Sequence, residues 1–503
     1  MYSEKALKNT IYNVASMLIT ALATFIVRTA FIKYLGEEIL GVNATIVDTV
    51  TLLTMSEMGI QTAIIYKMYK PILDGDIDRQ CVLFNLYRKA YRIVAVVIFV
   101  VGVALLPFIP FVIKTEIPFY TVYQAYILQL VLVVITYFVS YYKIILLSHQ
   151  RQYIYTRFEV VVNVACSVIK YVAIVVYNNY LLYLLTGYIA LLLNTLFVIY
   201  KTRQEYHSVL EKRNIPKEDI RSMFSDLKKM VVITISGYVY GSTDSILIST
   251  IFGSTLVGLI SNYKIVTTLI KNLVVSYISN SVAPSWGAFL NSRPGEAKIR
   301  EKYSLFTFIE FTVGAAFLLP TWLLIDDFIT LWIGAQFKIN ASIIGLIVLD
   351  IFMTSISEPN AVIIRNEGLF TQENFASLLA MVVNVVASIG LAFKVGVEGI
   401  FIGTIMADCI YTLIRSITVS KHCFIEPKRA IFKYYQDYLC YMLYFLVLFF
   451  MLNFLFKNIF TKVSITSFIV KGLISEFVII TTIVVFWYKT GKIKQVIQII
   501  KKA

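Results

Sequence analysis

Runs of twenty or more apolar residues, separated by short basic segments, dominate this sequence. No water is available inside a bilayer to hydrogen-bond the backbone, so a run of about 20 apolar residues crosses it as an α-helix. Hydrophobic residues make up 58% of the 503 positions and charged residues only 15%. A soluble domain carries roughly 25% charged residues. The sequence therefore predicts an all-α integral membrane protein.

The apolar runs predict about fourteen transmembrane helices, with ends placed only approximately. The first six lie near 10–32, 40–66, 92–113, 119–147, 155–177 and 181–200. The next six lie near 227–252, 256–283, 304–332, 341–364, 374–393 and 398–420, and a last pair lies near 436–456 and 465–488.

One long polar segment separates two sets of six predicted spans. We expect an N-terminal six-helix lobe at 1–203, a cytoplasmic linker at 204–226, a C-terminal six-helix lobe at 227–421, and a helix pair with a basic tail at 434–503. Because six is even, both lobes begin on the same side of the membrane. A repeat that relates them is therefore parallel, about an axis along the membrane normal.

The first turn of each lobe shows a trace of such a repeat. Aligning YLGEEILG in the first hairpin with IFGSTLVG in the seventh matches Gly36 with Gly253 and Gly41 with Gly258. Glycines match easily by chance in turns. Both turns, however, open their set of six spans, which favours two pseudo-symmetric lobes.

Lysine and arginine are distributed unevenly between the predicted loops. The loops on one side hold only six lysines: Lys33, Lys114, Lys338, Lys394, Lys457 and Lys462. Basic residues concentrate in cytoplasmic loops, so both termini are predicted to be cytoplasmic. The net charge of +15 reflects this orientation pattern, and we do not expect nucleic-acid binding.

The sequence favours transport over catalysis. Membrane enzymes that join or polymerise sugars outside the cell usually carry a large external loop, whereas all external loops predicted here are short. No nucleotide-binding motif is present, so we do not expect direct coupling to ATP. The five cysteines and three histidines show no ligand spacing, and we expect neither a metal nor a cofactor.

Ionisable residues inside a membrane are costly and are therefore candidates for function. Those in the predicted spans include Arg28, Asp48, Glu57, Lys170, Asp244, Lys264, Lys271, Glu310, Asp350, Asp408 and Lys471. We assign no role to Glu310, Asp350 or Asp408.

Two oppositely charged pairs flank the matched turns. Arg28 and Asp48 lie on either side of the first turn, and Asp244 and Lys264 on either side of the second. At about 1.5 Å per residue, all four lie roughly 15 Å from the outer surface. They either form ion pairs that hold adjacent helices together, or line a cavity and rearrange during transport. Apolar residues replace a purely structural pair at less cost, which favours the cavity.

The eighth predicted span carries two cations on one face. Lys264 and Lys271 are seven residues apart, and Thr267 and Thr268 lie beside them. Two cations and hydroxyl groups suit an anionic, hydroxyl-rich ligand such as a sugar pyrophosphate. The alternative is that Lys271 extends towards the cytoplasmic interface.

Two acids in the second predicted span are candidates for ion coupling. Glu57 lies nine residues after Asp48, which places it on the opposite helix face. Either acid is a candidate carrier of a coupling proton or sodium ion. The alternative is a buried, hydrogen-bonded carboxylate.

The first hairpin carries a family resemblance. RTAFIKYLGEEILGVN, starting at Arg28, and SEMGIQTAIIYKMYKPI, starting at Ser56, resemble polysaccharide flippases of Gram-positive bacteria. That superfamily includes multidrug exporters and the peptidoglycan-precursor flippase. The layout of two six-helix lobes, a linker and a last helix pair is similar as well.

The resemblance implies a function in the bacterial cytoplasmic membrane. Two lobes would rock about a central cationic cavity and carry an undecaprenyl-diphosphate-linked oligosaccharide to the outer leaflet, for capsule or exopolysaccharide assembly. An ion gradient or the membrane potential would drive transport, and glycosyltransferases and a polymerase would act beside it.

The resemblance also suggests site residues. In the peptidoglycan relative, an arginine in the first helix and basic residues in the eighth help to hold the diphosphate. Arg28, Lys264 and Lys271 would fill these roles by position, with Asp48, Glu57 and Asp244 as coupling or cavity acids. The last helix pair, which Lys471 and Glu476 interrupt, would form a groove for the lipid tail.

Two other functions remain as alternatives. An ion-coupled multidrug exporter of the same fold would have an acid-dominated cavity in the first lobe, and Arg28 and Lys264 argue against it. A polysaccharide polymerase or ligase is disfavoured because no large external loop is present.

Overall fold

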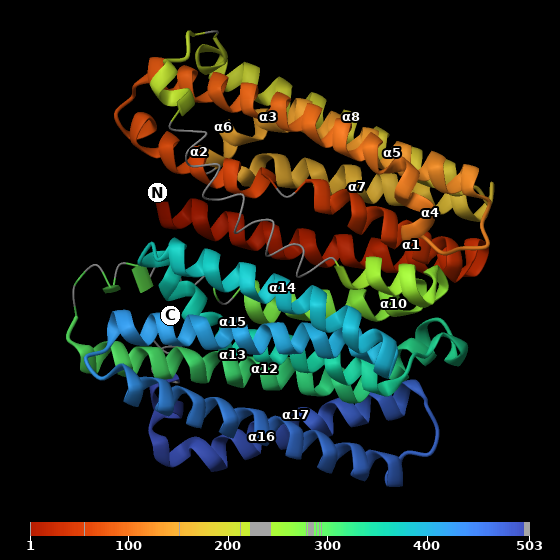
Figure 1. The fold of residues 1–503 in the computed structure, drawn as a ribbon, viewed down its shortest axis with the longest axis vertical. Helices are drawn as coiled ribbons and strands as arrows, with labels where there is room; N and C mark the ends of the chain where they lie inside the picture. The colour runs from red at the N-terminus through yellow and green to blue at the C-terminus, as the bar shows by residue number, and fades with distance from the viewer. Residues whose placement is uncertain are drawn as a thin grey trace. The chain divides into compact units, whose positions relative to one another are not determined.

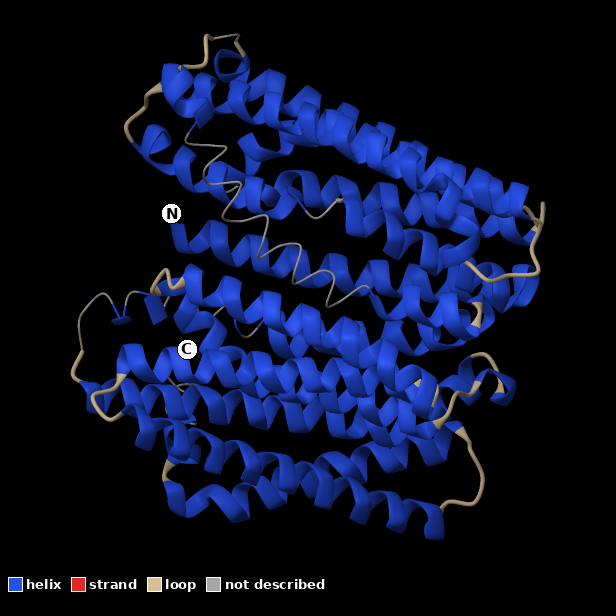
Figure 2. Cartoon of the chain, viewed as in Figure 1, coloured by secondary structure: helices blue, strands red, loops and turns tan. Residues whose placement is uncertain are grey.

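The structure is a computed structural model, and it describes residues 2–54, 56–149, 151–211, 213–221, 243–277, 279, 286–287, 289–290, 292 and 294–496. Side chains are described within these ranges except at 2–18, 56–63 and 66. Every regular element among the described residues is a helix, as Figure 2 shows. The chain divides into two compact units, Met1–Gly258 and Leu259–Ala503. The boundaries predicted from the sequence, with a linker at 204–226, remain a prediction.

The first unit is built from long helices and short connecting turns (Figure 1). Its elements are α1 (Tyr2–Leu53), α2 (Ser56–Leu73), α3 (Ile77–Leu105), α4 (Ile109–Val112), α5 (Phe119–Val139), α6 (Lys143–Ser148), α7 (Gln152–Val175), α8 (Tyr180–Tyr206), a 3-10 turn (His207–Leu210), the helix Thr243–Phe252 and the start of α10 (Ser254–Lys271).

Helix α1 comprises two helical segments joined at Gly36. Gly36 has φ 85° and ψ 167°, which no helix contains. A positive φ is accessible to glycine without the steric cost that a Cβ adds. The first two predicted spans therefore meet at the predicted turn.

The second predicted span, 40–66, is not continuous, and this part of the prediction is wrong. Helix α1 ends at Leu53 and α2 begins at Ser56. The hydroxyl of Tyr137 on α5 donates a hydrogen bond of 2.6 Å to the backbone carbonyl of Thr54. A break in a buried helix leaves carbonyls without partners. Because the partner of Thr54 lies 83 residues away, local sequence gave no sign of the break.

The glycines aligned between the two turns share their backbone geometry. Gly253 has φ 98°, which matches the positive φ of Gly36. Gly41 and Gly258 lie where the second helix of each turn begins. A Cβ on Gly41 would overlap the carbonyl oxygen of Ser254, and one on Gly258 would overlap that of Glu37. Only glycine allows the two backbones to approach this closely.

The second unit contains the remaining long helices (Figure 1). They are the rest of α10, a π-helical turn (Asn272–Tyr277), α12 (Glu296–Trp332), α13 (Ala341–Asn366), α14 (Phe370–Val395), α15 (Glu398–Cys423), α16 (Pro427–Ile459) and α17 (Ile465–Trp487).

An aromatic stripe fixes α16 within the second unit. Tyr441, Phe445 and Phe449 recur every four residues and so lie on one helix face. Each ring stacks on an aromatic ring of α12 or α13, and such offset pairs add to the free energy of apolar burial. The centroid distances are 4.1 Å for Phe311 with Tyr441, 3.9 Å for Phe352 with Phe445 and 3.6 Å for Trp322 with Phe449.

Eleven described helices are long and apolar enough to cross a membrane. Of the predicted spans, 40–66 is shared between α1 and α2, and 227–252 is described only over Thr243–Phe252. The span 256–283 corresponds to α10, which gives way to the π-helical turn. These helices make the chain a multi-pass membrane protein, as the sequence predicts.

Candidate functional site

The first unit places one lysine over an aromatic ring and carries a half-buried arginine within electrostatic range of the same tyrosine. The arginine is Arg28 on α1, and the tyrosine is Tyr183 on α8. The ammonium nitrogen of Lys170 on α7 lies 5.4 Å from the centroid of the Tyr183 ring. A cation at this distance is attracted by the ring quadrupole. We call Arg28, Lys170 and Tyr183 the first cationic cluster.

Aromatic packing and one hydrogen bond position this cluster. The ring of Phe31, one turn after Arg28, packs edge-on against Tyr183 at 5.0 Å between centroids. The Tyr180 hydroxyl donates a hydrogen bond of 3.1 Å to the side-chain oxygen of Asn43. These contacts tie the start of α8 to both segments of α1, so the Tyr183 ring beside Lys170 has a fixed orientation.

Lys170 has no carboxylate partner in the described part of the chain. The sequence listed Lys170 as an ionisable residue inside a span but did not place it at the site. Nothing local distinguishes it, because Tyr183 lies thirteen residues later on another helix. A lysine that has no acidic partner among the described residues and lies over an oriented ring suits an anionic group.

Four predicted site residues all have interaction partners. Arg28, Asp48, Asp244 and Lys264 each take part in a polar or electrostatic interaction, so none is an isolated charge. Asp244 is 8% exposed. Ion pairing and cavity lining both remain predictions for these residues.

The second unit carries the two predicted lysines on one helix. Lys264 and Lys271 both lie on α10, and both are half-buried. The Thr267 hydroxyl donates to the backbone carbonyl of Tyr263 at 3.2 Å, while Thr268 is exposed. Among the described residues no carboxylate forms an ion pair with Lys271. We call Lys264, Thr267, Thr268 and Lys271 the second cationic cluster.

The π-helical turn Asn272–Tyr277 follows Lys271 directly. Such turns are rare and are found mostly at functional sites. The π-helical turn rotates the residues that follow Lys271 about the helix axis relative to those that precede it. The sequence contains no proline or glycine there to signal it.

Glu57 lies in α2, but its side chain is outside the described residues. Its predicted coupling role stays a prediction. Glu310 on α12 is fully buried, and its carboxylate accepts hydrogen bonds from Ser355 at 3.4 Å and Ser279 at 3.5 Å. A buried acid held by two hydroxyls is a further candidate to bind a coupling ion.

Other charges within the spans of the second unit form ion pairs between helices. Lys471 on α17 lies 2.7 Å from Asp327 on α12, and both side chains are largely buried. Arg415 on α15 pairs with Glu373 on α14. Lys471 therefore docks the last helix onto α12. Sequence reasoning missed these pairs because the partners are 144 and 42 residues apart.

The sequence matches the family model described as "Polysaccharide biosynthesis protein" over residues 6–287. A search of curated protein sequences found no match.

Solved structures of membrane transporters share the fold. The lipid II flippase MurJ in its inward closed conformation aligns with a TM-score of 0.68 at 14% identity, over 96% of this chain and 99% of MurJ. An inward-facing multidrug resistance MATE family transporter of the MOP superfamily gives 0.56 at 14% identity, over 85% and 95%. The eukaryotic MATE transporter AtDTX14 gives 0.55 at 11% identity, over 84% and 98%. These neighbours are flippases and transporters, not enzymes, and they confirm the predicted fold class.

Proposed function

The chain belongs to the family of polysaccharide biosynthesis proteins, and on that premise we propose that it is a flippase for lipid-linked oligosaccharides. Its substrate is an undecaprenyl-diphosphate-linked repeat unit, and alternating access carries this unit across the bacterial cytoplasmic membrane. Both termini are cytoplasmic. The product serves capsule or exopolysaccharide assembly.

The first cationic cluster is the observation that carries this proposal. A diphosphate that enters a membrane protein needs cations to replace its water, and charge-assisted hydrogen bonds to phosphate oxygens are among the strongest available. Arg28 supplies a planar guanidinium that can bind two oxygens at once. Lys170, without a described acid, supplies a second positive charge in the same unit, over the Tyr183 ring.

The second cationic cluster supports the same substrate class. Lys264 and Lys271 offer two ammonium groups, and Thr268 offers an exposed hydroxyl on the same helix. An ammonium binds phosphate as a point charge, and a hydroxyl both donates and accepts hydrogen bonds with sugars. Each unit thus carries groups for an anionic, hydroxyl-rich ligand.

Coupling to an ion gradient completes the proposed mechanism. Asp48, Glu57 and Asp244 are the candidate acids from the sequence, and Glu310 joins them because of its burial and its two hydroxyl partners. A proton or a sodium ion bound there would bias the equilibrium between inward and outward states. Glycosyltransferases that build the repeat unit and a polymerase that consumes it are the expected partners.

An ion-coupled multidrug exporter is the second candidate function. The TM-score of 0.56 with a multidrug transporter favours it at the level of fold. Such an exporter would need acids, not cations, to hold cationic drugs. The cations of the first cluster argue for the flippase.

Deletion and complementation test the proposal. Cells that lack the chain should lose surface polysaccharide and accumulate lipid-linked repeat units inside. The wild-type chain and the control Lys394→Ala, which alters an exposed lysine at the end of α14, should restore display, whereas Arg28→Ala and Lys264→Ala should not. Unchanged polysaccharide with reduced dye efflux would establish the exporter instead.

A further inference from the structure

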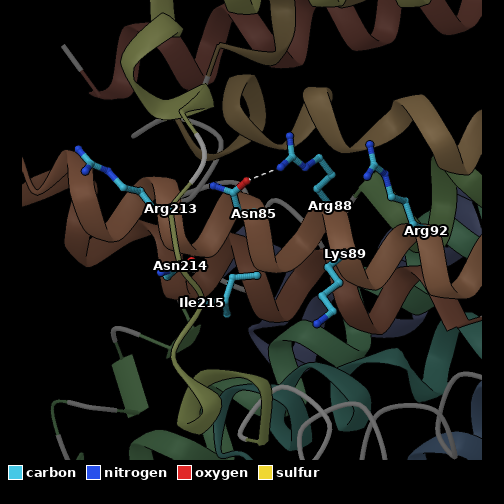
Figure 3. Close-up of a pocket in the computed structure, with 7 residues that line it drawn as sticks. All are labelled: Asn85, Arg88, Lys89, Arg92, Arg213, Asn214 and Ile215. Atoms are coloured by element: carbon cyan, nitrogen blue, oxygen red, sulfur yellow. Dashed lines mark hydrogen bonds between the residues drawn. The ribbon is translucent and has the colours of Figure 1, made fainter.

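A basic pocket lies at the start of α3, remote in sequence from both cationic clusters. It has a volume of about 380 Å³ and is lined by Asn85, Arg88, Lys89, Arg92, Arg213, Asn214 and Ile215. Figure 3 shows the segment 213–215 beside α3, with Arg88 and Arg92 extending to the same side of that helix. We call this the α3 pocket.

A buried amide shapes the α3 pocket. Asn85 is 4% exposed, and its side-chain nitrogen donates to the backbone carbonyls of Cys81 at 2.9 Å and Glu211 at 2.7 Å. Its side-chain oxygen accepts a hydrogen bond of 2.6 Å from Arg88, drawn as a dashed line in Figure 3. Asn85 therefore joins α3 to the following segment and orients the Arg88 guanidinium.

An ion pair holds the other wall of the pocket in place. Arg79 donates two hydrogen bonds, of 2.6 and 2.7 Å, to the carboxylate of Asp219. Arg213 in the same segment lies 2.9 Å from Asp78. The segment 213–221 is thus fixed to α3 at both ends, so the pocket is formed before any ligand binds.

Three cations of the pocket have no acidic partner among the described residues. Within the described ranges no carboxylate forms an ion pair with Arg88, Lys89 or Arg92. At about 100° per residue, all three fall within a 100° arc of the helix surface. The backbone positions of the three cations thus form one basic strip on α3, and Figure 3 shows Arg88 and Arg92 extending to one side of the helix and Lys89 to the other. No described carboxylate compensates these charges, which favours an anionic ligand.

An apolar groove begins where this basic strip ends. It has a volume of about 300 Å³ and is lined by Leu52, Leu53, Ile93, Val94, Val97, Ile98 and Val101. Lys89, Ile93, Val97 and Val101 follow one another at four-residue spacing, so they form a single ridge with the lysine at its head. Val97 is 54% exposed, which leaves room for a neighbour along the ridge.

The length of the groove matches one bilayer leaflet. From Ile93 to Val101 the helix rises about 12 Å, close to half of the roughly 30 Å hydrocarbon core. A basic pocket followed directly by an apolar groove of this length is complementary in shape and polarity to an amphiphile. Basic pockets on the cytoplasmic side of membrane helices bind anionic head groups in this way.

We propose that the α3 pocket and its groove bind one anionic phospholipid of the cytoplasmic leaflet. Arg88 and Arg92 hold the phosphate, Lys89 lies at the head of the ridge that borders the groove, and the groove between α1 and α3 holds an acyl chain. The groove opens onto exposed apolar side chains of α3, so a bilayer lipid enters laterally. None of the residues that line this site belongs to the two cationic clusters, and the inference does not depend on the proposed function.

Native mass spectrometry of the full chain, purified with phosphatidylglycerol or with phosphatidylcholine, tests the head-group site. The triple variant R88Q/K89Q/R92Q should retain at least fivefold less phosphatidylglycerol, with phosphatidylcholine unchanged. The matched control K394Q/K457Q/K462Q alters three lysines on the opposite predicted side and should retain both lipids normally. Equal phosphatidylglycerol retention by the triple variant and the wild type would overturn the proposal.

A separate variant tests whether the groove holds the acyl chain. Val97→Trp leaves all cations intact and should reduce phosphatidylglycerol retention by filling the slot. If Val97→Trp has no effect and inorganic phosphate displaces the lipid, the pocket is a plain anion site and the lipid proposal fails. If a polyprenyl diphosphate binds there and phosphatidylglycerol does not, the site belongs to substrate entry and the proposal is likewise wrong.

Discussion

Gly41 and Gly258 pack backbone against backbone within the first unit. A Cβ on Gly41 would lie 2.9 Å from the amide nitrogen of Gly258, and a Cβ on Gly258 would lie 3.2 Å from that of Gly41. The two residues occupy equivalent places in the aligned turns. The matching glycines of the two aligned turns are therefore in contact within the first unit.

This contact predicts a steric effect of substitution. Gly41→Ala should lower stability by about 1–3 kcal/mol, the usual cost of overpacking, because the new Cβ meets backbone that cannot rotate away. Gly390→Ala is the matched control, since nothing lies within 4 Å of its Cβ. Melting of the purified protein in detergent measures both. Equal melting temperatures for the two variants would contradict the close approach.

The first cationic cluster predicts a ranked series at Lys170. Lys170→Ala should abolish rescue of surface polysaccharide, and Lys170→Arg should restore part of it, because the charge returns with a different shape. Tyr183→Phe should keep most of the activity, since the ring, not the hydroxyl, faces the ammonium group. Rescue is scored at matched membrane levels. Full activity of Lys170→Ala would remove Lys170 from the site.

The second cationic cluster predicts weaker substrate binding. Lys264→Ala and Lys271→Ala should each raise the Kd for a polyprenyl diphosphate about tenfold, equivalent to about 1.4 kcal/mol. Thr268→Val tests the hydroxyl and should reduce affinity only when the ligand carries its sugar. If Lys271→Ala binds like the wild type while Lys264→Ala does not, Lys271 serves the membrane interface instead.

The buried pair of Lys471 and Asp327 predicts strong coupling between α17 and α12. Lys471→Ala should destabilise the protein by about 3–5 kcal/mol, because Asp327 is left as an uncompensated buried charge. The double variant K471L/D327L should recover much of that loss. The exposed pair of Arg429 and Glu426, 3.4 Å apart, is the control and should contribute less than about 1 kcal/mol. Additive effects at Lys471 and Asp327 in a double-mutant cycle would contradict the pair.

The ion pair between Arg79 and Asp219 predicts that the attachment of segment 213–221 to α3 depends on pH. The hydrogen bonds from Arg79 lower the pKa of Asp219 from its ordinary value of 3.8. A carboxylate with a depressed pKa contributes stability that is present above its unfolded pKa and lost as pH falls through the folded one. The protection of residues 213–221 against hydrogen exchange, relative to the intrinsic rate at each pH, should therefore stay high at neutral pH and fall only below about pH 4.

The variant Arg79→Ala distinguishes loss of this ion pair from unfolding of the whole protein at low pH. The variant should show fast exchange of the same segment already at pH 7, with exchange in α12 unchanged. Slow exchange at pH 7 in Arg79→Ala would mean that other contacts hold the segment.

The sequence by itself determined the class of protein and the place of most helices. Apolar runs specify spans because an unpaired backbone group in lipid is too costly, and that constraint acts within each helix. The two turns could be predicted from their glycines for a similar reason, because a positive φ is a local property of the backbone that favours glycine. The sequence also singled out Arg28 and Lys264 as costly charges, and their pairing with Asp48 and Asp244 stays a prediction.

Only the tertiary structure decided which side chains meet. After Leu53, where α1 ends, the hydroxyl of Tyr137 donates a hydrogen bond to the backbone carbonyl of Thr54. The ring beside Lys170 belongs to Tyr183. The acidic partner of Lys471 is Asp327. Each contact joins residues on different helices. Helical periodicity fixes which face a residue occupies, but not which helix packs against that face. That choice depends on packing between side chains from distant parts of the chain, and no local pattern encodes it.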